Sequence, residues 1–269
     1  MRQLIALLAV AALPASAQER IPSHCIALSQ GPERVMAASF REPVPLDAVR
    51  IAYLDHAMFL IQTLLVAAVT DFTGYIGNVD FLPDVVTMNN AHGTHWTAFP
   101  DPAIPHVLRG WAEDGQAASH RLDLGEMLVR NVPTDTRSRG GMASPDGNSV
   151  FVFEAGGMCI GHLGHLHHEP TPEDYALLGR LDVVMVPVDG GLTLDHDTLV
   201  RVLERLRSRV VIPMHWFGEA TLDSFLAELS ERAGYRVERR EGSEVVLTLG
   251  TLPDELTVVV LEPRLLSED

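Results

Sequence analysis

Histidines are the residues of this sequence whose type and spacing point most directly to chemistry. His92 and His95 stand within four positions of each other, a dense group of histidines falls between residues 162 and 168, and His215 stands apart from both. Imidazole nitrogens are common ligands of zinc and related metals. The pattern therefore predicts a transition-metal site. For each histidine taken singly, a structural role in a turn or in the core is the alternative.

Apolar, β-branched runs precede each of these histidine groups. Residues 85–88, 158–160 and 210–214 have the composition of buried strands, and the histidines follow where each strand gives way to a loop. The ends of strands in one sheet lie along one edge, so side chains far apart in the sequence can meet there. His56, which interrupts a strand-like stretch at residues 49–70, is equally compatible with a turn and with this site.

The remaining pattern predicts a single layered α/β domain. We expect a short helix between residues 100 and 110, then a loop-rich segment at 114–148 that contains a strand at 127–132 and a mobile surface loop at 137–141. Thr171 followed by Pro172 indicates the start of a helix. Helical spacing of leucines recurs around residues 199–206 and 222–229. Further strands are expected at 150–153, 183–188, 244–249 and 256–261.

The N-terminus has the three parts of a secretory signal peptide. Met1-Arg2-Gln3 is basic, residues 4–14 are apolar, and Ala15-Ser16-Ala17 has the small residues of a cleavage site. We therefore expect a signal peptide at residues 1–17, a mature domain at residues 18–269, and a periplasmic or secreted protein. An uncleaved membrane anchor is the alternative, although the apolar run is short for a bilayer.

The formal net charge of −16 disfavours nucleic acid as a partner, because an acidic surface repels a phosphate backbone. The expected partner is a small-molecule substrate, with no membrane association after signal cleavage and the oligomeric state left open. Cys25 and Cys159 do not form a zinc-binding cluster. They could pair in an oxidising compartment, but the apolar surroundings of Cys159 favour a small buried thiol.

The order of these landmarks resembles the metallo-β-lactamase superfamily, nearest to its branch of ascorbate-6-phosphate lactonase-like hydrolases. The resemblance covers residues 49–216 and rests on a set of short segments: Asp55-His56-Ala57, Asp71, the His92 loop, His162-Leu163-Gly164-His165, residues 186–191 and Pro213-Met214-His215. It implies an αββα sandwich in a single domain, with the metal site at one edge of the sheets.

Several positions depart from the family's metal-binding pattern. The loop motif His-x-His-x-Asp-His has Asn90 in place of its first histidine and Thr94 in place of its acidic ligand. The aspartate that bridges two metals in the family falls at His165, and only Asp135 could coordinate near the intermediate histidine. A carboxylate can bridge two cations, whereas a neutral imidazole offers one lone pair to one metal. These changes therefore predict one metal ion rather than two.

The resemblance implies His92, His95, His165 and His215 as the metal ligands. His95, His165 and His215 would form the three-nitrogen set of a catalytic zinc site with an open position for water. Zinc is the expected ion, with iron or manganese as alternatives.

Thr94 cannot act as a general base, so that role is expected for Asp135, His168 or Asp71. We expect a periplasmic metal-dependent hydrolase that acts on a small ester, lactone or related carbonyl substrate through a metal-activated water. A non-catalytic or metal-binding descendant of the fold and an iron-dependent redox enzyme in the same pocket are the alternatives. Substrate specificity is expected in the loops at residues 73–80 and 137–146.

Overall fold

The structure is a computed structural model that describes residues 40–137 and 142–268. The predicted signal peptide at residues 1–17, the expected start of the mature chain at Gln18, and Cys25 all lie outside the described residues. Of the surface loop predicted at residues 137–141, only Arg137 is described.

The first of two β-sheets has six strands. Its order is β13 (Glu244–Thr248), β1 (Ala48–Asp55), β2 (Met58–Gln62), β3 (Ala67–Val69), β4 (Val85–Met88) and β5 (His106–Arg109). The pairs from β13 to β3 are antiparallel, whereas β3, β4 and β5 run parallel. Strands β1, β2 and β4 are buried on both faces. This burial explains why their sequences are apolar runs rather than alternating patterns.

The second sheet has eight strands. Its order is β12 (Arg236–Arg239), β14 (Thr257–Val260), β11 (Val210–Met214), β10 (Val183–Pro187), β9 (Met158–His162), β8 (Ala143–Ala155), β7 (Met127–Arg137) and β6 (Arg121–Asp123). Strands β12, β14, β11, β10 and β9 run parallel, and β9 to β6 pair antiparallel. Because β9, β10 and β11 are parallel neighbours, their carboxyl ends and the loops that follow share one edge of the sheet.

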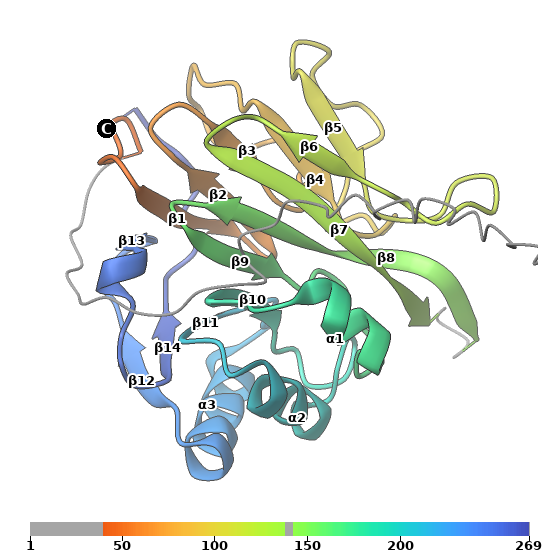
Figure 1. Ribbon diagram of the computed structural model, residues 1–269, viewed down its shortest axis with the longest axis vertical. Coiled ribbons are helices and arrows are strands. Elements are labelled where there is room, and N and C mark those ends of the chain that lie inside the picture. Colours follow the sequence, from red (N-terminus) through yellow and green to blue (C-terminus); the bar gives the residue numbers. More distant parts are fainter. Residues whose placement is uncertain (1–39, 138–141, 269) are drawn as a thin grey trace, which may run out of the picture.

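Apolar layers lie between the sheets and on the outer face of each sheet. The layer between the sheets includes Ile51, Phe59, Phe153, Ile160 and Ile212, all fully buried. Full burial of one such side chain stabilises the fold by about 1.5–3 kcal/mol. Helices α1 (Pro172–Leu178), α2 (His196–Leu206) and α3 (Glu219–Ala233) cover the outer face of the second sheet (Figure 1). Within the described ranges, the apolar outer face of the first sheet is covered by loops and carries no helix.

The predicted α/β sandwich in a single domain is confirmed. Its αββα layering is present except for one helical layer, because loops cover the outer face of the first sheet in the described residues. The predicted helix start is also confirmed, since Thr171 caps α1 in a reciprocal pair of hydrogen bonds with Asp174. The helix predicted between residues 100 and 110 is wrong, because residues 106–109 form β5 at the edge of the first sheet. The segment at 114–148, predicted to be rich in loops, also contains more strand than expected. There β7 extends to Arg137 and β8 begins at Ala143, and the long β7–β8 pairing stabilises their polar ends.

Cys159 is fully buried in β9, but it takes part in a disulfide, so the expectation of a buried thiol is wrong. None of the helices in the described part of the chain is long and apolar enough to cross a membrane.

Candidate metal centre

Five histidines from four different loops converge at the edge where strands β1, β4, β9 and β11 end. His56 follows β1, His92 and His95 follow β4, His165 follows β9 and His215 follows β11. They form two overlapping groups of three whose ring nitrogens lie within 4.8 Å of one another: His56, His95 and His215, and His92, His95 and His165. The predicted ligands His92, His95, His165 and His215 are thus brought together. The structure adds His56, which the sequence left undecided.

His95 is fixed by a buried carboxylate behind it. Its Nδ1 lies 2.5 Å from Oδ2 of Asp71, and both side chains are fully buried. The other oxygen of Asp71 accepts a hydrogen bond of 2.8 Å from the backbone N–H of Asn89. A carboxylate in this position holds a histidine with its hydrogen on Nδ1 and its free lone pair on Nε2, an arrangement common behind metal ligands.

His215 has an equivalent partner on the neighbouring strand. Its Nδ1 lies 3.0 Å from Oδ2 of Asp189, which follows β10, although the angle falls short of a well-aligned hydrogen bond. Burial alone would raise the pKa of Asp189. The nearby His215 imidazole, together with hydrogen bonds from the hydroxyl and backbone of Thr193 and from the backbone of Gly191, outweighs burial and lowers this pKa. Asp189 is therefore an ionised carboxylate that directs Nε2 of His215 toward the cluster.

The Nε2 atoms of His95 and His215 lie 3.2 Å apart. When Asp71 and Asp189 are ionised and each accepts the Nδ1 hydrogen of its histidine, neither Nε2 carries a hydrogen, and two lone pairs meet in a buried place. Two nitrogens bound to one tetrahedral zinc at about 2.0–2.1 Å would lie about 3.4 Å apart. The observed separation therefore fits two ligands of a single cation.

The electrostatic state of the cluster also suits a cation. Burial, followed by the neighbouring His215 and His95, lowers the pKa of His56 to about 3. Burial and nearby histidines likewise lower the pKa of His165 to about 2 and that of His95 well below its ordinary range. These imidazoles are neutral near pH 7, the form that binds metals. Burial raises the pKa of Asp71 to about 7, and a cation on Nε2 of His95 would favour its ionised form.

Three residues of the site have strained backbones. His56, Asp71 and His215 have φ angles of 40°, 42° and 61°, in the left-handed region that non-glycine residues rarely adopt. The backbone N–H of His215 donates to the carbonyl of His56 at 2.8 Å, and the Tyr53 hydroxyl donates to the same carbonyl at 2.7 Å. Strain held in place by such contacts is typical of functional sites.

The three residues predicted as general bases lie elsewhere or are already engaged. Asp71 is buried behind His95 and uses both carboxylate oxygens. His168 accepts from the backbone N–H of Asp135 with Nε2 and lies 2.9 Å from the carbonyl of Glu169 through Nδ1, so neither ring nitrogen is free. Asp135 is exposed and accepts from the backbone N–H of Asp146. The geometry does not fit Asp71 or His168 as a base, and Asp135 belongs to neither histidine group.

The two substituted positions of the His92 loop also have other partners. The side-chain amide of Asn90 donates to the carbonyl of Gly147 at 2.6 Å, and the Thr94 hydroxyl lies 3.2 Å from Nδ1 of His92. His162, by contrast, is a satisfied core histidine. It is fully buried, with Nε2 2.7 Å from the carbonyl of Ala57 and Nδ1 3.1 Å from the Asn89 side chain.

His56 and Asp189 are functional residues whose roles the sequence alone did not predict. Both stand in segments that carry the family resemblance, Asp55-His56-Ala57 and residues 186–191, and this was the signal that could have identified them. Their roles depend on which side chains face them, and that information is absent from local sequence.

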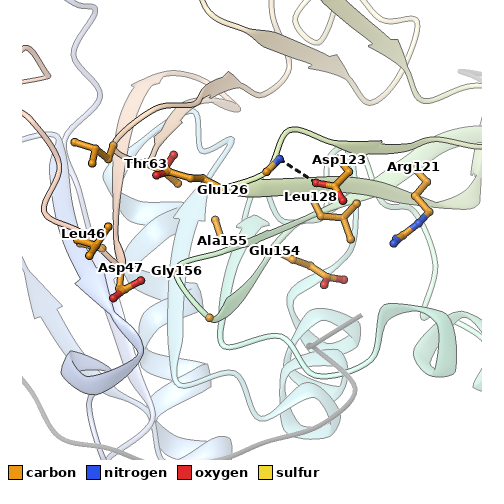
Figure 2. Close-up of a pocket in the computed structure, with 14 residues that line it drawn as sticks. Leu46, Asp47, Thr63, Arg121, Asp123, Glu126, Leu128, Glu154, Ala155 and Gly156 are labelled. Atoms are coloured by element: carbon orange, nitrogen blue, oxygen red, sulfur yellow. Dashed lines mark hydrogen bonds between the residues drawn. The ribbon is translucent and has the colours of Figure 1, made fainter. Parts of the chain in front are cut away.

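A cavity of about 320 Å³ lies at the opposite end of strands β8 and β9, around their connecting turn (Figure 2). Its lining includes Leu46, Asp123, Glu126, Glu154 and Gly156. The β9 strand runs from this turn to His162, so the cavity is separated from the histidine cluster by the length of the strand.

Comparison with known proteins supports the family predicted from the sequence. The profile of the beta-lactamase superfamily domain matches residues 50–215. A UPF0173 protein of Pyrococcus furiosus is 32% identical over 205 residues, which cover 68% of this chain and 92% of the relative. A UPF0173 metal-dependent hydrolase of Nanoarchaeum equitans is 25% identical over 184 residues, covering 62% of this chain and 84% of the relative.

The fold agrees with solved structures. A Thermotoga maritima protein, described as a candidate Zn-dependent hydrolase of the metallo-β-lactamase superfamily, superposes with a TM-score of 0.56 at 26% identity, covering 80% of this chain and 100% of that one. The matched residues 50–215 contain every histidine of the cluster. The chain therefore belongs to the metallo-β-lactamase superfamily, among relatives that are named metal-dependent hydrolases.

Proposed function

We propose that this chain is a hydrolase that uses one zinc ion to cleave a small ester or lactone. The observation that carries the proposal is the pair of Nε2 atoms on His95 and His215, 3.2 Å apart, with a carboxylate at each Nδ1. Two ring nitrogens placed in this way fit a bound cation, on which a metal-activated water depends. The names of the relatives support the same reaction class.

The reaction adds the oxygen of a water to the carbonyl carbon and breaks the bond from that carbon to the alcohol oxygen. The alcohol oxygen takes up a proton as it leaves. A divalent ion at the cluster would supply a water with a pKa near 7 and polarise the carbonyl. Asp71 and Asp189 orient His95 and His215, and the backbone bond between His215 and His56 holds the two loops together.

The branch of ascorbate-6-phosphate lactonase-like hydrolases is the part of the superfamily that we propose for this chain. It is supported by the order of Asp55-His56-Ala57, Asp71 and His162-Leu163-Gly164-His165 in the sequence. Lactones therefore belong in the substrate panel beside simple esters. Of the two segments expected to select among them, residues 73–80 lie in the connection between β3 and β4. In the other, residues 137–146, Arg137 ends β7 and residues 143–146 form the start of β8.

The test combines metal analysis with a panel of esters and lactones. His215→Ala should lose both metal and activity, because the remaining histidines cannot replace a ligand held by Asp189. His196→Ala is the control, since His196 lies at the start of α2 and belongs to neither histidine group. Equal metal content in the two variants would remove His215 from the site. Tight metal binding without hydrolysis of any substrate would favour a non-catalytic descendant. Bound iron together with oxidase activity would favour a redox enzyme.

We further propose that the protein acts in the periplasm or is secreted. The support is the basic start, apolar core and small-residue site of residues 1–17. N-terminal sequencing of the protein purified from its native cells should give a start near Gln18. Soluble protein that begins at Met1 or Arg2 would contradict this location.

A further inference from the structure

A chain of hydrogen bonds leads from Arg137 into the histidine cluster. The Nε–H of Arg137, at the end of β7, donates to Nδ1 of His167 at 3.1 Å, and a terminal nitrogen of the same guanidinium donates to the carbonyl of Thr193 at 2.8 Å. Nε2 of His167 lies 2.6 Å from Nδ1 of His165. A guanidinium can only donate, so Nδ1 of His167 must be an acceptor.

The direction of the first bond fixes the direction of the second. A neutral imidazole has one N–H and one lone pair, so His167 carries its hydrogen on Nε2 and donates it to Nδ1 of His165. His165 then carries its own hydrogen on Nε2. A nitrogen that bears hydrogen has no lone pair for a metal.

His165 thus carries its hydrogen on the opposite ring nitrogen from His95 and His215. The partners of those two histidines are carboxyl groups, which in their ionised form only accept, so their Nδ1 atoms then hold the hydrogen and their Nε2 atoms are free. His165 lies against them, with its ring centroid 4.7 Å from that of His95 and 5.4 Å from that of His215. The cluster therefore combines nitrogens that can bind a cation with one N–H that can only donate.

His56 is placed to supply the third metal-binding nitrogen. Its ring centroid is 3.9 Å from that of His215, and it forms a three-histidine group with His215 and His95. Its carbonyl is bound by the backbone of His215 and by the Tyr53 hydroxyl. These contacts hold the strained backbone at φ 40°, so the ring is kept beside its neighbour.

We propose that His56, His95 and His215 bind the metal ion and that His165 donates a hydrogen bond to the substrate oxygen that becomes negatively charged during attack. Arg137 and His167 are positioning residues that fix the tautomer of His165. The role of His165 rests on the proposed hydrolase, whereas the ligand set does not. This assignment replaces the expectation that His92 and His165 bind the metal.

Zinc affinity, measured by competition with a chromophoric chelator, tests the ligand set without any substrate. His56→Ala should raise the zinc Kd by more than about 100-fold, because loss of a ligand costs more than the ~10–100-fold of an orienting residue. His165→Ala should leave the zinc Kd unchanged. Melting temperatures of both variants with metal removed show that they fold. Loss of zinc from His165→Ala together with normal affinity in His56→Ala would overturn the proposal.

Nitrogen-15 NMR of the histidine rings in the zinc-loaded protein tests the tautomer. The spectrum should show His165 with hydrogen on Nε2, and Arg137→Met should change this signal while zinc remains bound. Arg236→Met is the matched control, an exposed arginine on β12 at the far edge of the same sheet. A His165 signal typical of a zinc-bound nitrogen, or one unchanged in Arg137→Met, would overturn the proposal.

Kinetics on any ester or lactone that the protein hydrolyses provides a third test. His165→Ala should lower kcat by about 10²–10³-fold, the typical cost of removing one such donor. His165→Gln, which retains an N–H donor, should recover part of that loss. Should no substrate be found, the proposed hydrolase fails while the zinc and NMR results still decide the ligand set. Full kcat in His165→Ala would contradict the donor role.

Discussion

The Nδ1 atom of His95 lies 2.5 Å from Oδ2 of Asp71, and both side chains are inaccessible to solvent. A buried carboxylate is costly unless its partners satisfy it, and among the described residues Asp71 bonds to the backbone N–H of Asn89 and to this imidazole. A cation bound on the far side of His95 would offset the negative charge of this buried carboxylate. This relationship leads to the first prediction.

Asp71→Asn should weaken zinc binding by about 10–100-fold, the usual effect of losing the residue that orients a metal-binding histidine. An amide is a weaker acceptor for the Nδ1–H of His95 and does not offset the positive charge beyond it. Competition with a chelator measures the change. Asp182→Asn is the control, because Asp182 is buried but accepts from the backbone of Cys159 and from Arg180 instead of a histidine. It should lower the melting temperature and leave the zinc Kd unchanged.

Zinc titration should saturate near one equivalent per chain. His95 belongs to both three-histidine groups, but Asp71 occupies its Nδ1, so it has one nitrogen to offer. The two groups therefore cannot both be filled with three nitrogens each. Calorimetry with zinc on metal-free protein measures the stoichiometry, and elemental analysis checks it. Two tight equivalents would show that another residue completes a second site.

The metal-free protein should lose stability as the pH falls from 7 to 5. The folded pKa values of His56, His165 and His167 are lowered to about 3, 2 and 4, below their ordinary value of 6.5, chiefly by burial and, for His167, also by Arg137. Below about pH 6.5 the unfolded chain binds protons that the folded chain does not, so the free energy of unfolding falls. Asp71, with its pKa raised to about 7 by burial, acts in the opposite direction, but it is one group against three.

Melting temperatures of chelator-treated protein at pH 7.5, 6 and 5 check this pH dependence. His56→Gln should show a smaller decrease, because one of the depressed groups is removed. A melting temperature that rises or stays constant over this range would contradict the neutral state of the cluster.

Gly164→Ala should destabilise the protein by about 2–4 kcal/mol, combining a left-handed backbone with overpacking. Gly164 has a φ of +57°, and a Cβ there would lie 2.2 Å from Nδ2 of Asn89, which donates to the carbonyl of Ser149. Gly115→Ala is the matched control. Its φ is +76° but no atom lies within 4 Å of a Cβ, so its cost should be about 1 kcal/mol. Chemical denaturation measures both variants, and equal losses would show that the Asn89 contact does not matter.

The fold and the location of the site followed from local sequence where the signal was strong. Apolar runs such as residues 85–88 and 210–214 are strands because they are buried on both faces, and the histidines after them lie at one edge because neighbouring strands end there. The failures were polar segments. β5 has only four residues, and the ends of β7 and β8 have little apolar content of their own. These segments are strands because they pair with a neighbour.

The sequence by itself determined that histidines would gather at the edge of an α/β sandwich, since the spacing of apolar strands dictates that edge. Only the tertiary structure decided what each histidine can do there. The hydrogen on an imidazole is placed by its partner, and those partners come from other strands: Asp71 for His95, Asp189 for His215, and Arg137 through His167 for His165. Because such pairs form only when distant segments pack together, no local pattern could separate a nitrogen that binds a metal from one that donates a hydrogen bond.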